Sequence, residues 1–233
     1  TSMDHEDDDP GTTWNQRARA DKPDWMSPRM AWRAIQSALP KDAIISSDIG
    51  NNCAIGNAYP SFDEGRKYLA PGLFGPCGYG LPSIVGAKIG QPHVPVVGFS
   101  GDGAFGIAVN ELTAIGRDEW PAVTQIVFRN YQWGAEKRNS TLWFDDNFVG
   151  TELDTKVSYA GIAQACGLLG VQVKTMDELT AALNLAIKDQ MENNKTTLIE
   201  VILNQELGEP FRRDAMKRPV QVAGIDAADM AAE

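Results

Sequence analysis

The hydrophobic positions along this 233-residue chain alternate between short continuous runs and helically spaced patterns. Continuous apolar runs of strand length, rich in β-branched residues, occupy residues 94–99 and 123–128. Between them, apolar side chains recur at helical spacing at Phe105, Ile107, Val109, Leu112 and Ile115. Apolar runs of this kind are typical of buried parallel strands, and the spaced pattern is typical of an amphipathic helix. The segment therefore predicts a βαβ unit.

The same alternation continues on both sides of this unit. Further strands are predicted at 43–47, 171–174 and 197–203, and further helices from 28, from 79, at 159–169 and at 175–191. Strands that alternate with helices predict an α/β fold, here a doubly wound, mainly parallel sheet with helices on both faces. The folded domain is expected to span residues 28–204.

Two of the predicted helices carry start signals. Ser27 precedes Pro28, a capping residue followed by proline in the first turn. Thr175 and Glu178 have the spacing of a capping box. The expected buried faces are Met30, Ile35, Ala38 and Leu39 in the first helix, and Leu179, Leu183, Ala186, Ile187 and Met191 in the second.

The two ends of the chain have a different composition. Residues 1–27 are polar and acidic and build no hydrophobic face, which predicts a disordered linker or the severed end of a preceding domain. Residues 205–233 are predicted to form a charged, irregular carboxyl-terminal tail.

Composition and charge exclude some classes of function. A hydrophobic content of 43% is enough for a core, and the net charge of −10 argues against nucleic acid or an anionic membrane as partner. Cys53, Cys77 and Cys166 lack metal-ligand spacing, which favours a reduced, cytoplasmic protein over a disulfide scaffold. We also expect neither a membrane-spanning segment nor a signal peptide.

Polar residues follow both strands of the βαβ unit. Asp102 lies between Gly101 and Gly103 directly after the first strand, and Asn130 follows the second. Open α/β sheets bind ligands at the carboxyl ends of their strands. Carboxylate and amide oxygens suit Mg²⁺, which is often shared with phosphate oxygens, and the start of the following helix favours anions. The pattern predicts a site that holds a diphosphate through a metal ion.

Gly-Asp-Gly, the 26 residues 104–129 and an asparagine together resemble the thiamine-diphosphate signature of the pyruvate-oxidase and acetolactate-synthase superfamily. The resemblance implies that Asp102, the side-chain oxygen of Asn130 and the backbone carbonyl of Gln132 bind Mg²⁺. The superfamily usually has two asparagines here, and the first is replaced by Arg129. The alternative is a Gly-Asp-Gly hairpin and a chance asparagine.

The resemblance also implies contacts to thiamine diphosphate beyond the metal. The turn after the first predicted strand would bind the diphosphate, and a glycine-rich segment, residues 72–90, would lie against the cofactor rings. The implied contacts are Gly50, Asn51, Asn52, Gly75, Cys77, Gly101, Asp102, Gly103, Ala104, Asn130, Gln132, Trp133 and Gly134. Cys77 is smaller than the apolar residue that usually supports the bent cofactor. For the turn after the first strand, the alternative is an ordinary helix start. For residues 72–90, the alternative is plain helix–sheet packing.

Three segments narrow the resemblance further: FRNYQWGAEKRNSTLWF, LFGPCGYGLPSIVGAKIG and NQELGEPFRRDAMK. They are similar to the carboxyl-terminal third of the sulfoacetaldehyde acetyltransferases, over a stretch from about residue 11 to the end. That family converts sulfoacetaldehyde and phosphate to acetyl phosphate and sulfite, and the cofactor supplies the carbanion chemistry. Residues 133–148 would then be a lid or substrate wall. Arg138, Arg212 and Arg213 are candidates for binding the substrate anions, with solvated surface cations as the alternative.

The resemblance also points to a missing part. In this superfamily a glutamate from an amino-terminal pyrimidine-binding domain activates the cofactor, usually across the interface of a homodimer or homotetramer. Residues 1–27 are too few for such a domain, so the catalytic glutamate cannot be assigned here and the chain alone is expected to be inactive. Three interpretations stay open: part of the acetyltransferase, the small subunit of a two-chain decarboxylase or an acetolactate-synthase-like enzyme, and a non-catalytic binding module.

Overall fold

A computed structural model describes residues 25–57, 59–65, 67–144 and 147–207, and it places a six-stranded sheet within these residues. The strand order is β2-β1-β3-β4-β6-β5, and every neighbouring pair is parallel. The strands are β1 Ile44–Ser47, β2 Tyr68–Leu69, β3 Val96–Gly101, β4 Thr124–Arg129, β5 Leu169–Val173 and β6 Thr197–Ile202. The predicted parallel α/β fold is confirmed.

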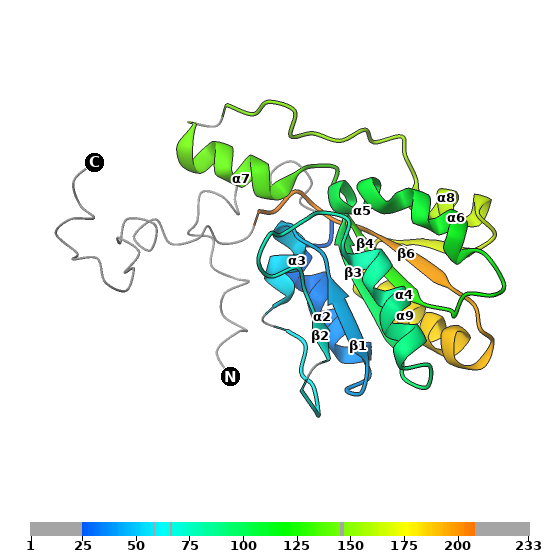
Figure 1. Ribbon diagram of the computed structural model, residues 1–233. Coiled ribbons are helices and arrows are strands. Elements are labelled where there is room, and N and C mark those ends of the chain that lie inside the picture. The colour runs from blue at the N-terminus through cyan, green and yellow to red at the C-terminus, as the bar shows by residue number, and fades with distance from the viewer. Residues whose placement is uncertain (1–24, 58, 66, 145–146, 208–233) are drawn as a thin grey trace.

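Helices cover both faces of this sheet (Figure 1). They are α2 Pro28–Ala38, α3 Asn51–Gly56, α4 Gly80–Gly90, α5 Asp102–Ala108, α6 Leu112–Ile115, α7 Gly134–Trp143, α8 Tyr159–Ala165 and α9 Met176–Glu192, with a 3₁₀ turn, η2, at Val109–Glu111. Side chains alternate along β3, so Phe99 packs in the core with α2 and α9, and Val96 packs in the other core with α4, α5 and α8. No helix in the described part of the chain is long and apolar enough to cross a membrane.

The buried face of α2 differs from the prediction. Ser27 caps the helix as expected, since its hydroxyl accepts a hydrogen bond from the Met30 N–H at 3.2 Å. However, Met30 is exposed, and the centre of the buried face is Trp32. The indole of Trp32 packs against Phe99 and donates a hydrogen bond from Nε1 to a backbone carbonyl. The predicted face is confirmed at Ile35, and Ala38 and Leu39 are partly buried against the same core. It was wrong at Met30 and omitted Trp32, whose ring fills the core between α2 and the sheet.

The capping box of α9 is confirmed, and its buried face needs one correction. The Thr175 hydroxyl accepts from the Glu178 N–H at 3.2 Å, and the Glu178 carboxylate accepts from the Thr175 N–H at 3.3 Å. Met191 is partly exposed, and the buried residue at this end is Gln190. Its amide pairs with both the N–H and the C=O of Val96, each at 2.8 Å. Buried polar groups are stable when they are hydrogen-bonded in this way.

Two further segments depart from the sequence-based expectation. The helix predicted after Gly103 is divided into α5, η2 and α6. Ile107 is exposed because, two residues after the buried Phe105, it lies on the opposite side of α5. Residues 205–207, which were expected in the tail, are ordered against the domain, and Leu207 is buried. The neighbouring Asn204 N–H bonds to the carbonyl of Met26 at 3.0 Å, which ties this end of the domain to its beginning.

Gly56 gives a test of the packing around Trp32. A Cβ at Gly56 would lie 2.1 Å from the indole ring of Trp32, so Gly56→Ala should lower the free energy of unfolding by about 1–3 kcal/mol. Gly86→Ala in α4 is the matched control, because nothing lies within 4 Å of its Cβ position. Denaturant titration should show destabilisation for Gly56→Ala only. Equal stability of both variants would contradict the packing.

Candidate functional site

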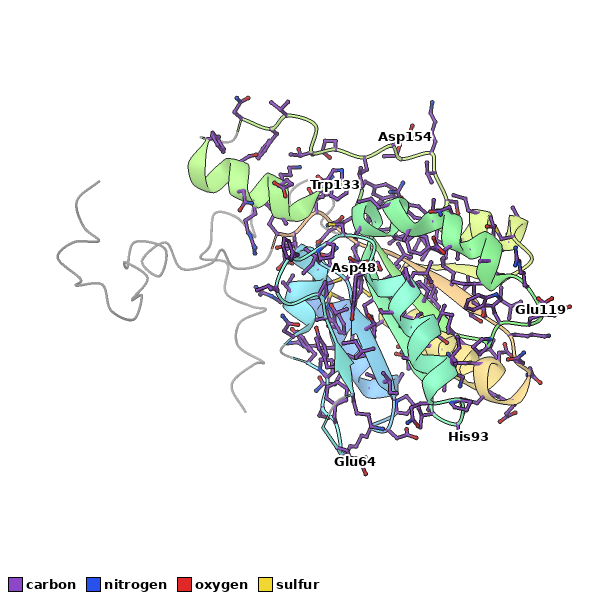
Figure 2. The ribbon with its side chains drawn as sticks, viewed as in Figure 1. Asp48, Glu64, His93, Glu119, Trp133 and Asp154 are labelled. Atoms are coloured by element: carbon purple, nitrogen blue, oxygen red, sulfur yellow. The ribbon has the colours of Figure 1, made fainter. Side chains whose placement is uncertain are left out.

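Three polar residues that follow strands gather at one edge of the sheet. Asp48 comes after β1, Asp102 after the last residue of β3, and Asn130 after β4. The register pairs Ser47 with Phe99 and Gly101 with Phe128, so these strands end within about two residues of one another at the same edge of the sheet. Figure 2 shows Asp48 and Trp133 at this end of the sheet, away from Glu64 and His93. The predicted location of the site is the one at which parallel α/β sheets bind ligands.

Asp102 is almost completely buried at the start of α5. Its Oδ1 accepts a hydrogen bond from the Gly103 N–H at 3.0 Å, and its Oδ2 accepts from the Tyr131 N–H at 2.6 Å. The Arg129 guanidinium also reaches Oδ2, at 3.2 Å from Nη1. Burial raises the pKa of Asp102 to about 6, and the positive charge of Arg129 acts in the opposite direction. The carboxylate is therefore held in a fixed orientation with acceptor capacity left over.

The turn after β4 has an unusual backbone conformation beside the site. Tyr131 has a positive φ of 61°, a left-handed conformation that non-glycine residues seldom adopt. An isolated bridge joins Gln132 to Glu152 through the Tyr131 carbonyl and the Trp133 N–H. The Gln132 carbonyl accepts neither of the two bridge hydrogen bonds, and Asn130 and Gln132 are both buried. This turn thus places the buried residues Asn130 and Gln132 in the same cavity wall as Asp102.

A cavity of about 90 Å³ lies among these groups. All of the predicted cofactor contacts except Gly75 line it: Gly50, Asn51, Asn52, Cys77, Gly101, Asp102, Gly103, Ala104, Asn130, Gln132, Trp133 and Gly134. Sequence reasoning missed three lining residues, Ile49, Ala135 and Glu136. Ile49 was in a segment already singled out, and the helical phase of α7 could have indicated the other two. Burial raises the pKa of the Cys77 thiol, and the negative charges of Asp48 and Glu136 add to this effect.

The cavity wall contains polar atoms suited to a polar ligand. Both side-chain amide atoms of Asn51, Oδ1 of Asn52 and Oε1 of Gln132 are buried and have no hydrogen-bond partner among the described residues. Buried polar groups without partners are rare in folded proteins. Asn51 offers a donor and an acceptor, and the carboxylate and amide oxygens nearby are the ligands that Mg²⁺ prefers. The residues present therefore fit a metal-bound anionic cofactor.

Asp48 organises the loop that carries Gly75 and Cys77, although sequence reasoning gave it no role. Its Oδ1 accepts from the Gly78 N–H at 3.0 Å, and its Oδ2 accepts from the Gly80 N–H at 2.9 Å. A Cβ at Gly80 would lie 2.7 Å from the Ser100 hydroxyl, so only glycine allows this close approach. Gly75 lies next to Ile49, outside the cavity wall. A buried aspartate directly after a strand is the signal that could have indicated this anchor.

Of the three predicted substrate arginines, Arg138 lies within the described residues, and it does not line the cavity. Arg138 is buried within α7, where burial lowers the pKa of its guanidinium. Arg212 and Arg213 lie outside the described residues. Residues 134–143, predicted to be part of a lid or substrate wall, form α7, and its first turn lines the cavity.

The fold and the site together are those of a cofactor-binding α/β domain with a polar cavity at the carboxyl ends of its strands. The family model described as "Thiamine pyrophosphate enzyme, C-terminal TPP binding domain" matches residues 48–201. This chain belongs to that family of thiamine-diphosphate-binding domains.

Several relatives have closely similar sequences. The chain is 84% identical over 230 residues to a sulfoacetaldehyde acetyltransferase of Roseovarius nubinhibens, and 78% identical over 229 residues to one of Rhodobacter capsulatus. These alignments cover 99% and 98% of this chain but only 38% and 39% of the relatives. The chain thus spans less than two-fifths of the length of the relatives that it matches.

Solved structures show the same fold at lower identity. A thiamine-diphosphate-dependent 4-hydroxybenzoylformate decarboxylase of Rhodococcus jostii superposes with a TM-score of 0.69 at 24% identity, covering 77% of this chain and 33% of the decarboxylase. A benzoylformate decarboxylase of Polynucleobacter necessarius gives a TM-score of 0.67 at 22% identity, covering 78% of this chain and 33% of the decarboxylase. At these identities the similarity concerns the fold alone.

Proposed function

We propose that this chain is the cofactor-binding part of a thiamine-diphosphate-dependent acetyltransferase that converts sulfoacetaldehyde and phosphate to acetyl phosphate and sulfite. The observation that carries the proposal is the 84% identity to a sulfoacetaldehyde acetyltransferase over nearly the whole chain, together with a cavity lined by the expected contacts. The reaction transfers an acetyl group to phosphate and releases sulfite, so it needs no external oxidant or reductant.

We propose that Asp102, the side-chain oxygen of Asn130 and the backbone carbonyl of Gln132 hold Mg²⁺. A single carboxylate plus neutral oxygen donors leaves coordination positions for phosphate oxygens and water, which Mg²⁺ usually retains. Among the described residues no group of three or more histidine, cysteine, aspartate or glutamate side chains could hold a metal. This agrees with a site in which the cofactor itself supplies part of the coordination.

The other residues of the cavity wall would bind and orient the cofactor. The amides of Asn51 and Asn52 supply hydrogen-bonding atoms for the diphosphate. The ring of Trp133 packs close to Gly103, next to Asp102. When bound, thiamine diphosphate supplies the carbanion chemistry at its thiazolium ring. The contribution of this chain is then to fix the diphosphate and to keep water away from the buried ligands.

The remainder of the cofactor cleft would come from an amino-terminal pyrimidine-binding domain. Cofactor sites commonly enclose about 300–1,000 Å³, whereas the cavity here measures about 90 Å³. Leu73 and Phe74 are more than 90% exposed, and Ile49 and Ile107 are also exposed. Gly75 contacts Ile49 and Gly78 packs near Ile107, so these apolar side chains surround one glycine-rich loop. We propose that this surface packs against that domain in a homodimer or homotetramer, since exposed apolar patches commonly mark interfaces.

The proposed reaction can be tested in the full-length protein. Purified protein with Mg²⁺ and thiamine diphosphate should form acetyl phosphate and sulfite in equal amounts from sulfoacetaldehyde and phosphate. Pyruvate in place of sulfoacetaldehyde is the control that separates this reaction from acetolactate-synthase-like chemistry. Product formation from pyruvate but not from sulfoacetaldehyde would contradict the proposed substrate.

Arg138, Arg212 and Arg213 are the proposed ligands of the sulfonate and phosphate groups. Guanidinium groups match such oxygens, and loss of a hydrogen bond to a charged group commonly costs about 1.5–3 kcal/mol. Replacing each arginine by glutamine should therefore raise the apparent KM for one of the two anions by about 10–100-fold. Arg117→Gln, on the exposed surface, is the control. If all three variants keep the KM values of the unchanged protein, these arginines do not bind substrate.

A further inference from the structure

The strongest unexplained feature of the site is a buried charge cluster behind Asp102. Arg129 on β4 and Glu200 on the adjacent strand β6, two register positions apart, are almost completely inaccessible to solvent. Burying a charge is costly unless it is paired, and buried ion pairs are weak contributors to stability. The buried cluster therefore needs an explanation.

Arg129 contacts Asp102 directly. Its Nη1 donates to Oδ2 of Asp102 at 3.2 Å, while the Tyr131 N–H donates to the same oxygen at 2.6 Å. Among the described residues, Oδ1 of Asp102 accepts one hydrogen bond, from the Gly103 N–H at 3.0 Å. A carboxylate oxygen can accept two hydrogen bonds, so Oδ1 retains capacity for a cation. The two donors on Oδ2 fix which oxygen remains for that purpose.

The guanidinium of Arg129 is itself held from several sides. Its Nη2 donates to the backbone carbonyls of Asp154 and Val157, the latter at 3.2 Å. Its Cζ lies 4.3 Å from the ring centroid of Tyr131 and 5.1 Å from that of Tyr159, distances typical of cation–π contacts. Arg129 therefore links Asp102 to Tyr131, whose left-handed backbone separates Asn130 from Gln132.

Glu200 balances the charge of Arg129. Its Oε1 lies 3.7 Å from Nε of Arg129, an ion-pair distance longer than a hydrogen bond. Its Oε2 accepts from the Ser158 hydroxyl at 3.0 Å and from the Ala160 N–H at 3.2 Å. The formal charges of Asp102, Arg129 and Glu200 add to one negative charge. Without Glu200, the charge of Arg129 would cancel that of Asp102.

We propose that Arg129 is a positioning residue for the cation site: it directs Oδ1 of Asp102 toward the ion and supports the Asn130–Gln132 turn, while Glu200 neutralises its charge. Neither residue lines the cavity, so they act through the ligands. Partners behind metal ligands commonly change metal affinity by about 10–100-fold when they are replaced. This inference rests on the proposed cation site at Asp102.

The test measures the affinity for Mn²⁺, a spectroscopic substitute for Mg²⁺, by electron paramagnetic resonance of the full-length protein with thiamine diphosphate. Glu200→Gln, which preserves the shape of the side chain, should weaken Mn²⁺ binding by about 10–100-fold. The double variant R129Q/E200Q restores the original formal charge but lacks the guanidinium, and it should still bind Mn²⁺ about tenfold more weakly. Arg129→Lys, which keeps the charge and one donor group, should lose less Mn²⁺ affinity than the double variant.

Melting temperatures without metal separate this role from a purely structural one. If Glu200→Gln and the double variant lose thermal stability but keep the original Mn²⁺ affinity where they are folded, the positioning role is overturned. Recovery of full affinity in the double variant alone would also overturn it, because charge balance would then be the whole effect. Asp102→Asn tests the underlying cation site separately. If that variant binds Mn²⁺ normally, the proposed site fails, whereas loss of binding only in Asp102→Asn refutes the inference about Arg129 alone.

Discussion

Asp102→Ala should abolish binding of thiamine diphosphate and Mg²⁺ to the full-length protein. The expected loss is large because Asp102 is the only carboxylate of the proposed metal set, and the cofactor diphosphate would be attached to the domain through that metal. The substitution also removes the partner of Nη1 of Arg129. Isothermal calorimetry should show at least about a hundredfold loss of cofactor affinity, in line with the effect of removing a buried charged partner.

Two controls make this result specific. Asp102→Asn keeps the size of the side chain, so cofactor binding should fall with the circular dichroism unchanged. Asp118→Asn changes an exposed aspartate outside the cavity wall and should bind the cofactor normally. Unchanged affinity in both Asp102 variants would show that the cofactor is not held through this residue.

The second large effect concerns residues 1–233 on their own. They should form a folded α/β domain, since both cores of the sheet are built from residues within the chain. They should not turn over sulfoacetaldehyde, because we propose that the activating glutamate and half of the cleft come from another domain. Proton transfer commonly contributes a factor of about 10²–10⁴ to a rate, and loss of positioning removes more.

The assay uses purified residues 1–233 with Mg²⁺, thiamine diphosphate, phosphate and sulfoacetaldehyde. Acetyl phosphate formation should stay at the level without protein, while the full-length protein is active under the same conditions. Adding the amino-terminal part of the full-length protein in trans should restore measurable turnover. Turnover by residues 1–233 comparable to that of the full-length protein would contradict the proposed need for a second domain.

Much of this fold could be predicted because strand and helix patterns depend on local chemistry. Continuous apolar runs marked β3 and β4, and the capping box at Thr175 marked the start of α9. The buried faces of helices were less predictable, since they depend on which large ring fills the core. Trp32 and Gln190 are buried because of partners on β3, Phe99 and Val96, which are distant in the sequence and which no local pattern reveals.

In the candidate site, too, local patterns could be predicted from the sequence and long-range contacts could not. Asp102 and Asn130 could be placed because each directly follows a recognisable strand. Asp48 and Arg129 could not be given roles, because their contacts join segments that are far apart in the sequence. Asp48 reaches Gly78 and Gly80 across 30 and 32 positions, and Arg129 reaches Asp102 across 27. Such pairings depend on strand order, which the hydrophobic pattern does not specify.

The central claim is that Asp102, Asn130 and Gln132 together hold the cation that binds the cofactor. The most direct measurement is the anomalous X-ray signal of Mn²⁺ in crystals of the full-length protein grown with thiamine diphosphate. We expect one strong peak within about 2.0–2.3 Å of Oδ1 of Asp102, the side-chain oxygen of Asn130 and the carbonyl oxygen of Gln132. A cofactor-bound crystal with its Mn²⁺ peak at other residues would contradict it.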